Sequence, residues 1–126
     1  MFTRISCNKD KSRFLGELLI ITAIGIMLLG RHIGILHYVF IKYKQITIHG
    51  WSIAHFLLFL IMGLFCAKQT AMFMLFGVLW ELFEYVYGHL TNDVLYWTSG
   101  GIINQFMDIF MNFSGYTTGQ FLSKYI

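Results

Sequence analysis

Three acidic side chains lie inside stretches of this chain that are otherwise apolar enough to cross a membrane. Glu81 and Glu84 belong to the run of residues 72–88, and Asp108 belongs to the run of residues 104–122. An acidic residue near the middle of a membrane helix costs about 2.5–3.5 kcal/mol on insertion scales. Ionisable residues at such positions usually mark a site that binds, reacts or transports. These acids are therefore the candidate functional residues.

Carboxylates that lie close together in apolar surroundings repel one another, so they need protons, a cation or basic partners. His55 supplies one base, and Arg31 is the strong cation nearest in membrane depth. A divalent metal is the other option, because carboxylate oxygens with one imidazole suit Mg²⁺, Mn²⁺ or Zn²⁺. Its candidate ligands are His55, Glu81, Glu84 and Asp108. The sequence leaves both options open.

Composition places these residues in a membrane protein. Of the 126 residues, 57% are hydrophobic and 12% are charged, whereas an average soluble domain is about 25% charged. The net charge of +3 is small and scattered, which argues against a nucleic-acid partner. Cys7 and Cys66 form no C-x-x-C pair, so we expect free thiols. We predict an all-α polytopic domain over residues 14–126, preceded by a basic cytoplasmic tail at residues 1–13.

Four stretches are candidates for membrane-spanning helices in an up-down bundle. They are residues 14–30, 51–67, 70–88 and 104–122, the last being the least hydrophobic. The first follows a basic segment, as in a secretory signal, but no small-x-small cleavage site follows it, so we expect an uncleaved helix. Residues 31–50 either extend this helix or lie on the surface as an amphipathic piece. Residues 89–103 are expected to form a loop.

The distribution of basic residues predicts the orientation. Six lie on the side of the two termini: Arg4, Lys9, Lys11, Arg13, Lys68 and Lys124. Three lie on the opposite side: Arg31, Lys42 and Lys44. Because positive residues accumulate on the cytoplasmic side, we expect an integral membrane protein with both termini in the cytoplasm.

The candidate residues lie at similar depths in the predicted helices. His55 and Asp108 each come about one turn after the start of a helix, and Glu84 comes about one turn before the end of one. In an up-down bundle these helix ends share one side of the membrane. At about 1.5 Å per residue, they fall within about two turns of one level. We expect five residues to meet there: His55, Glu81, Glu84, Asp108 and Asn112.

Glycines follow the same faces. Gly77 and Gly88 share a stripe with the two glutamates of the third helix, at about 100° per residue. Gly115 and Gly119 continue the stripe of Asp108 on the fourth helix in a small-x-x-x-small pattern. Glycine allows helices to approach closely. We therefore expect these four glycines to be packing residues, with the stripes of the third and fourth helices facing each other.

The order of these residues resembles the VanZ-like membrane proteins. The similarity consists of E-x-x-E on one membrane helix and D-x3-N-x2-G-x3-G on the next, with a histidine in the preceding helix. It covers about residues 55–119. Glu84 replaces the more usual glutamine, and residues 85–107 lack the basic residue often found between the motifs. The matching residues are His55, Glu81, Glu84, Asp108, Asn112, Gly115 and Gly119.

The resemblance implies a small polytopic protein of a family whose founding member is associated with resistance to a glycopeptide antibiotic. We expect an intramembrane acidic pocket that binds a polar lipid headgroup or a lipid-linked glycan. Processing of the bound molecule is left open. Glu81 and Asp108 are the central acids of the pocket, and Glu84, His55 and Asn112 position the ligand or a divalent metal. The alternative is a non-enzymatic module, either a small proton- or cation-coupled transporter or an assembly partner. Bound metal, or turnover of a lipid, favours the first, and charge pairs that bridge helices without a cavity favour the second.

Overall fold

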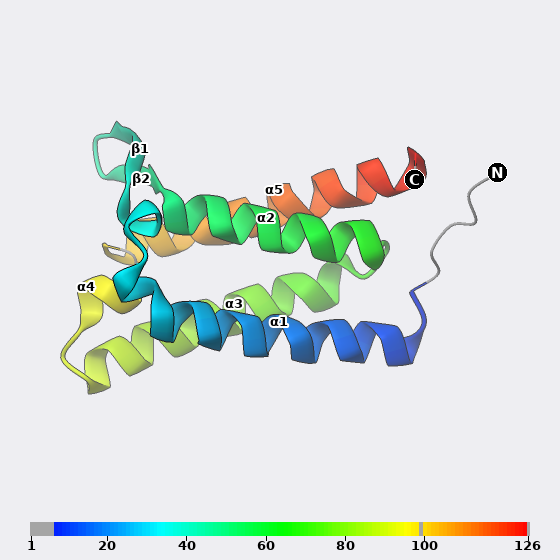
Figure 1. Cartoon of the computed structure of the whole chain (residues 1–126), viewed down its shortest axis with the longest axis horizontal. Helices are drawn as coiled ribbons and strands as arrows, with labels where there is room; N and C mark the ends of the chain where they lie inside the picture. Colours follow the sequence, from blue (N-terminus) through cyan, green and yellow to red (C-terminus); the bar gives the residue numbers. More distant parts are fainter. Residues whose placement is uncertain (1–6, 99, 126) are drawn as a thin grey trace.

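Four long helices run along the long axis of the molecule (Figure 1). The computed structural model describes residues 7–98 and 100–125, and most of them are helical. The long helices are α1 (Lys9–Leu29), α2 (Gly50–Phe65), α3 (Thr70–Leu90) and α5 (Ile102–Leu122). The predicted helical class is confirmed. Helix α1 begins within the segment that was expected to be a tail.

The start of α1 and the end of α5 lie at one end of the molecule, which we call the terminal end (Figure 1). The turn between α2 and α3 also lies there. The short helix α4 (Val94–Trp97) lies at the opposite end, before Gly100 and Gly101, both of which have positive φ. Two positions of interest for orientation, Arg4 and Ile126, lie outside the described residues.

Residues 30–50 fold differently from the expectation. Two 3₁₀ turns, η1 (Gly30–His32) and η2 (Gly34–His37), lead into an antiparallel hairpin of β1 (Val39–Tyr43) and β2 (Ile46–His49). The predicted helix extension or amphipathic piece is therefore wrong. The physical reason is local, because β-branched and aromatic residues dominate both strands and fit a pleated surface. Lys44 takes a positive φ of 53° where the chain turns.

Side chains at the helix starts fix where two of the helices begin. The Asn8 side chain accepts a hydrogen bond of 2.8 Å from the backbone N–H of Lys11 at the start of α1. At the start of α2, His49 and Ser52 form a reciprocal capping box. Such contacts satisfy backbone N–H groups that have no partner inside the helix. The cap of α2 therefore sets where His55, about one turn further on, enters the bundle.

Helices α2 and α5 form the closest pair of the bundle. Their glycines allow it, because a Cβ added at Gly63, Gly115 or Gly119 would collide with backbone atoms of the facing helix. The expectation that the Gly115–Gly119 stripe faces α3 is thus wrong, since it faces α2. Gly77 meets the Asn112 side chain on α5, and Gly88 meets α4. Periodicity gave the right face of α5 but could not name the neighbour.

Helix α1 joins the other helices through two hydrophobic clusters. At the terminal end, Leu15 and Leu19 pack with buried residues of α2, α3 and α5. At the hairpin end, Met27 packs with Trp51 and Trp97. The two clusters leave the middle of α1 facing a less tightly packed region of the bundle.

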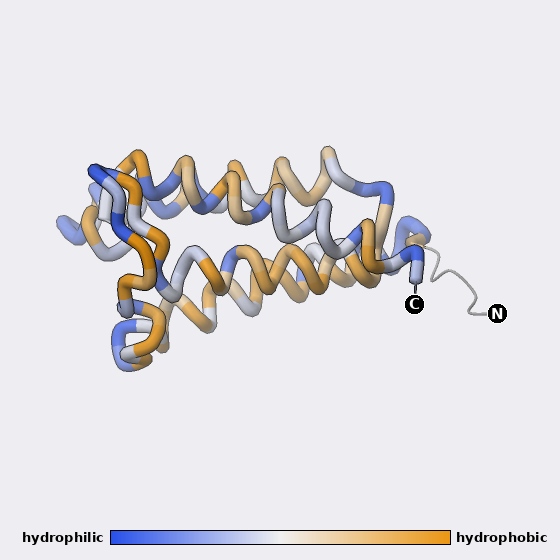
Figure 2. Tube along the Cα trace, turned by 90° about the horizontal axis from the view of Figure 1, so that it is seen from above, coloured by the Kyte–Doolittle hydropathy of each residue, from blue (hydrophilic) through white to orange (hydrophobic). Residues whose placement is uncertain are grey.

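Two segments are long and apolar enough to cross a membrane. An 18-residue window within Lys9–His32 has a mean hydropathy of 1.9, and one within Thr70–Leu90 has a mean of 1.2. In each of these windows 28% of the residues are buried inside the protein. Helix α2 has 16 residues and is shorter. Hydrophobic residues extend along the helices, and hydrophilic ones lie at the two ends and also partway along one layer of the bundle (Figure 2). All four long helices expose large apolar side chains, including Ile21, Leu57, Leu79 and Phe110.

A disulfide joins Cys7 to Cys66 at the terminal end, with a Cα–Cα distance of 4.8 Å. The expectation of free thiols is therefore wrong. The two cysteines are 59 residues apart in the sequence, and neither belongs to a spacing motif that would have signalled a pair. The bridge ties the segment before α1 to the residue that ends α2. Tyr116 on α5 holds the same turn, because its hydroxyl donates a 2.5 Å hydrogen bond to the Cys66 carbonyl oxygen.

The glycine contact yields a test of the fold. We expect Gly119→Ala to lower the free energy of unfolding by about 1–3 kcal/mol, because its methyl group forces α2 and α5 apart. Gly25→Ala is the matched control, since no atom lies within 4 Å of a Cβ at that position. It should be neutral, or stabilising by up to about 1 kcal/mol through helix propensity. Thermal and denaturant unfolding in detergent measure both, and equal effects of the two substitutions would contradict the close α2–α5 contact.

Candidate functional site

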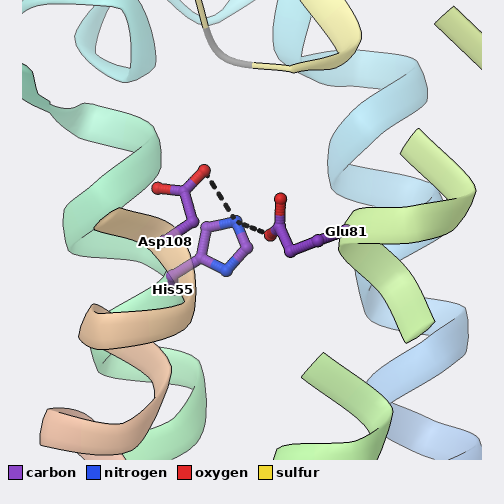
Figure 3. A group of neighbouring side chains, drawn as sticks. All are labelled: His55, Glu81 and Asp108. Atoms are coloured by element: carbon purple, nitrogen blue, oxygen red, sulfur yellow. Dashed lines mark ion pairs between the residues drawn. The ribbon is translucent and has the colours of Figure 1, made fainter. Parts of the chain in front are cut away.

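Three helices bring His55, Glu81 and Asp108 together (Figure 3). His55 Nε2 of α2 lies 3.7 Å from Glu81 Oε1 of α3 and 3.7 Å from Asp108 Oδ2 of α5. One ligand atom from each residue lies within 4.8 Å of the other two. Glu81 is 4% exposed and Asp108 is fully buried. The expected meeting of these residues at one level is confirmed.

Asn112 holds the imidazole from the other side. Its Oδ1 lies 2.8 Å from His55 Nδ1. An amide oxygen only accepts hydrogen bonds, so Nδ1 carries a proton and donates it. This fixes the ring so that Nε2 points at the two carboxylates. Asn112 is itself 1% exposed, and it lies one turn beyond Asp108 on α5, as expected.

Glu84 lies one turn along α3 from Glu81 and is 2% exposed. The indole N–H of Trp80 donates a 2.6 Å hydrogen bond to its Oε1. Gln105 on α5 donates a 2.7 Å hydrogen bond to the backbone oxygen of Glu81. Trp80 and Gln105 were not among the predicted site residues. Gln105 could have been found, because it lies three residues before Asp108 on the same face of α5.

Part of the acidic cluster is not satisfied by the protein. Within residues 7–98 and 100–125, neither carboxylate oxygen of Glu81 has a hydrogen-bond partner, and Oε2 of Glu84 has none. Buried polar atoms are nearly always hydrogen-bonded, and an orphaned one costs about 1–3 kcal/mol, or more if charged. Unsatisfied carboxylate oxygens where three helices converge are typical of a site that binds a ligand or an ion.

Arg31 does not neutralise these acids. It forms an ion pair with Asp93 at the hairpin end and lies over the Tyr96 ring, with its guanidinium carbon 3.8 Å from the ring centroid. Burial raises the pKa of the Tyr96 hydroxyl above its usual value, and Arg31 partly opposes that rise. The hydroxyl donates to the Met27 carbonyl oxygen. Depth alone had made Arg31 a candidate counter-ion, but Asp93 at the start of α4 takes that role.

A cavity of about 370 Å³ adjoins the cluster, within the range of about 300–1,000 Å³ typical of ligand pockets. Its walls are mostly apolar and come chiefly from α1, α2 and α3. They include Leu19, Ala23, Met27, Ala54, Phe59 and Trp80. Its polar lining is formed by His55, Glu84 and Asn112. The cavity lies between the two hydrophobic clusters, and among the acidic residues Glu84 lines it.

The geometry limits which residues could hold a metal ion. His55, Glu81 and Asp108 form a group of three potential ligands. Glu84, the fourth residue expected in that set, instead lines the cavity beside them. The arrangement can bind a cation, or it can accept hydrogen bonds from a ligand that carries several hydroxyl or ammonium groups. Glu84 is held by the hydrogen bond from Trp80, and that contact involves no metal.

The separation of Arg31 from the acids makes a testable prediction. Glu81→Gln removes one of several like charges while keeping the shape, so the free energy of unfolding in EDTA should stay unchanged or rise by up to about 2 kcal/mol. If a buried cation needed Glu81, the loss would instead be about 3–5 kcal/mol. Glu17→Gln is the control: Glu17 forms an exposed pair with Arg13 at 3.0 Å, and its loss should matter by less than about 1 kcal/mol. Thermal unfolding in detergent separates these outcomes.

Comparison of the chain with protein-family models, with characterised proteins and with solved structures finds no match. Its resemblance to the VanZ-like proteins therefore rests on the motif residues alone. The chemistry open to the site follows from its unsatisfied carboxylate oxygens, its oriented histidine and the cavity beside them.

Proposed function

We propose that this chain is a VanZ-like membrane protein whose acidic pocket binds the polar headgroup of a lipid or of a lipid-linked glycan. The observation that carries the proposal is the junction of two unlike environments. Glu84, whose Oε2 has no hydrogen-bond partner among the described residues, lines a mostly apolar cavity of about 370 Å³, and Glu81 lies one turn away. An amphiphile has the same division, with a hydrogen-bonding head and a hydrocarbon chain. Glu81 and Asp108 are the central acids, and Glu84, His55 and Asn112 position the head.

A four-span bundle is part of this proposal. Two segments pass the test of length and hydropathy. The distribution of side chains supports the other two spans, because α2 and α5 expose Leu57, Ile61, Phe106 and Phe110 while α5 buries Asp108. Soluble proteins usually do the reverse with charged residues. At about 1.5 Å per residue, the 21 residues of α5 reach about 30 Å, the thickness of a hydrocarbon core.

The alternative, a non-enzymatic transporter or assembly partner, receives less support. Charge pairs bridging helices without a cavity would favour it. Here His55 does bridge helices by pairing with Glu81 and Asp108 at 3.7 Å, but His55 and Glu84 also line a cavity with apolar walls. A purely ionic pathway has no use for such walls, but a hydrocarbon chain does. The proposed role is binding, because the sequence has no nucleophile motif beside the acids.

We expect Ala23→Phe to reduce the amount of amphiphile that stays with the purified protein several-fold, because the phenyl ring fills the cavity that Ala23 lines. The matched control is Ala71→Phe, at an exposed position of α3. Lipids extracted from each protein, purified in mild detergent, are quantified per chain by mass spectrometry. Equal retention by the two variants and the unmodified chain would contradict a lipid-binding cavity.

For the orientation, we propose that both termini face the cytoplasm, following the excess of Lys and Arg on the terminal end. The disulfide at that end argues the other way, because disulfides are rare in reducing compartments. Single cysteines at Gln45 and Tyr125, placed in a Cys7→Ser, Cys66→Ser background, decide between the two. A membrane-impermeant maleimide should label residue 45 in intact cells, and residue 125 only after permeabilisation. The opposite pattern would place the disulfide end outside.

A further inference from the structure

We infer that His55, Glu81 and Asp108 bind one divalent cation of the Mn²⁺ or Zn²⁺ class, with Asn112 as a positioning residue for the imidazole. The ion's part in headgroup recognition rests on the proposed function, but ion binding itself does not. Three features carry the inference: the spacing of the donor atoms, the orientation of the ring, and the burial of Glu81, whose carboxylate oxygens have no hydrogen-bond partner among the described residues.

The donor atoms are spaced for an ion and not for direct hydrogen bonds. Glu81 Oε1 and Asp108 Oδ2 each lie 3.7 Å from His55 Nε2. This distance is beyond the usual N–H···O range of about 2.7–3.2 Å. Two donors bound at about 2.1 Å to one ion, and separated by 3.7 Å, subtend about 120° at the ion. All three donor atoms lie within 4.8 Å of one another, so the two carboxylates need to approach each other by roughly 1 Å to close the site around an ion bound at about 2.1 Å.

The ring is oriented as a metal-binding histidine requires. Because Nδ1–H donates to Asn112 Oδ1 at 2.8 Å, Nε2 presents its lone pair to the acids when the imidazole is neutral. Metal-bound histidines commonly donate their other ring N–H to such an acceptor, which fixes the tautomer and the ring direction. A neutral ring with its lone pair facing two carboxylates is repulsive, and a cation between them removes that repulsion.

Burial supplies the need for positive charge. Glu81 is 4% exposed, and both of its oxygens lack hydrogen-bond partners among the described residues. The strong cation expected nearby, Arg31, is paired with Asp93 instead. Carboxylates in an apolar interior are strongly disfavoured unless they are paired, protonated or bound to a metal. A divalent ion compensates Glu81 and Asp108 together, which one imidazolium cannot do.

Three protein ligands leave at least one coordination position open, as in metal sites that act on an exogenous ligand. His55 and Asn112 also line the cavity, so the open position is available to an oxygen atom entering from that side. A headgroup hydroxyl or phosphate oxygen has the required chemistry. The ion would thus fix the head of the amphiphile while the apolar walls hold its chain.

Mn²⁺ alone tests the site, because its electron paramagnetic resonance signal distinguishes free from bound ions. Detergent-purified protein is stripped with EDTA, dialysed and titrated with Mn²⁺. We expect one bound ion per chain, and Glu81→Gln and Asp108→Asn should each weaken binding at least about tenfold. Glu17→Gln is the matched control. It removes an exposed acid in the first half of α1 that pairs with Arg13, and it should leave the Mn²⁺ affinity unchanged.

Asn112 provides a sharper readout of positioning. Asn112→Leu removes the acceptor for Nδ1–H and should weaken Mn²⁺ binding about 10–100-fold, the usual range for such supporting residues. Asn112→Asp keeps an acceptor and should restore most of the affinity. Circular dichroism and gel filtration confirm that each variant is folded, and Mn²⁺ should raise the unfolding temperature of the unmodified chain but not that of Asp108→Asn.

Absence of bound Mn²⁺ at millimolar concentration, or an equal loss in Glu17→Gln and Glu81→Gln, would overturn the inference. A His55 imidazolium between two acids would give the first result. The proposed function fails separately: an ion that binds without any lipid retained by the cavity contradicts lipid recognition and leaves the metal site in place. Lipid retention that depends on Ala23 but not on metal would support lipid binding and contradict a role of the ion in it.

Discussion

The burial of several carboxylates inside a bundle with an apolar exterior is the constraint on which the rest of the structure depends. Asp108, Glu81 and Glu84 are almost fully removed from solvent, and ionised groups in such surroundings require compensation. The helix starts, the short turns and the close α2–α5 contact all place these groups at one level. The histidine then lies where its Nε2 faces two of them.

Small residues and hydrophobic clusters share the task of holding this level. The glycines of α2 and α5 let the two backbones approach, so that His55 reaches Asp108 and Asn112 across a narrow gap. The clusters at either end pack the remaining helices. Packing is therefore tight at the ends and between α2 and α5, and looser beside the acids. A ligand site needs such a division, because rigid walls orient its polar groups while unfilled space admits the ligand.

Depth could be predicted from sequence because helical rise is regular and the connections are short. That reasoning brought His55, Glu81 and Asp108 together correctly. It failed where a choice among neighbours was needed: periodicity identifies the face that carries Gly119 but not the helix it meets. It also failed for Arg31, whose partner lies in a loop where no periodicity exists, and for residues 39–49, where a helix extension or an amphipathic piece was expected and a β-hairpin is found. The Cys7–Cys66 bridge depends on tertiary contact and has no local signal.

Helix α1 is attached at its two ends and lightly packed between them. The disulfide and the Leu15–Leu19 contacts secure one end, and Met27 with the Arg31–Asp93 pair secures the other. Between these anchors, α1 is a wall of the cavity, and its outer side exposes apolar residues such as Ile21 and Leu28. A helix held at its two ends bends most easily at its middle. If the cavity holds a lipid in a membrane as proposed, outward bowing of α1 would open a lateral portal, and the lipid would enter sideways from its own leaflet without crossing an aqueous phase.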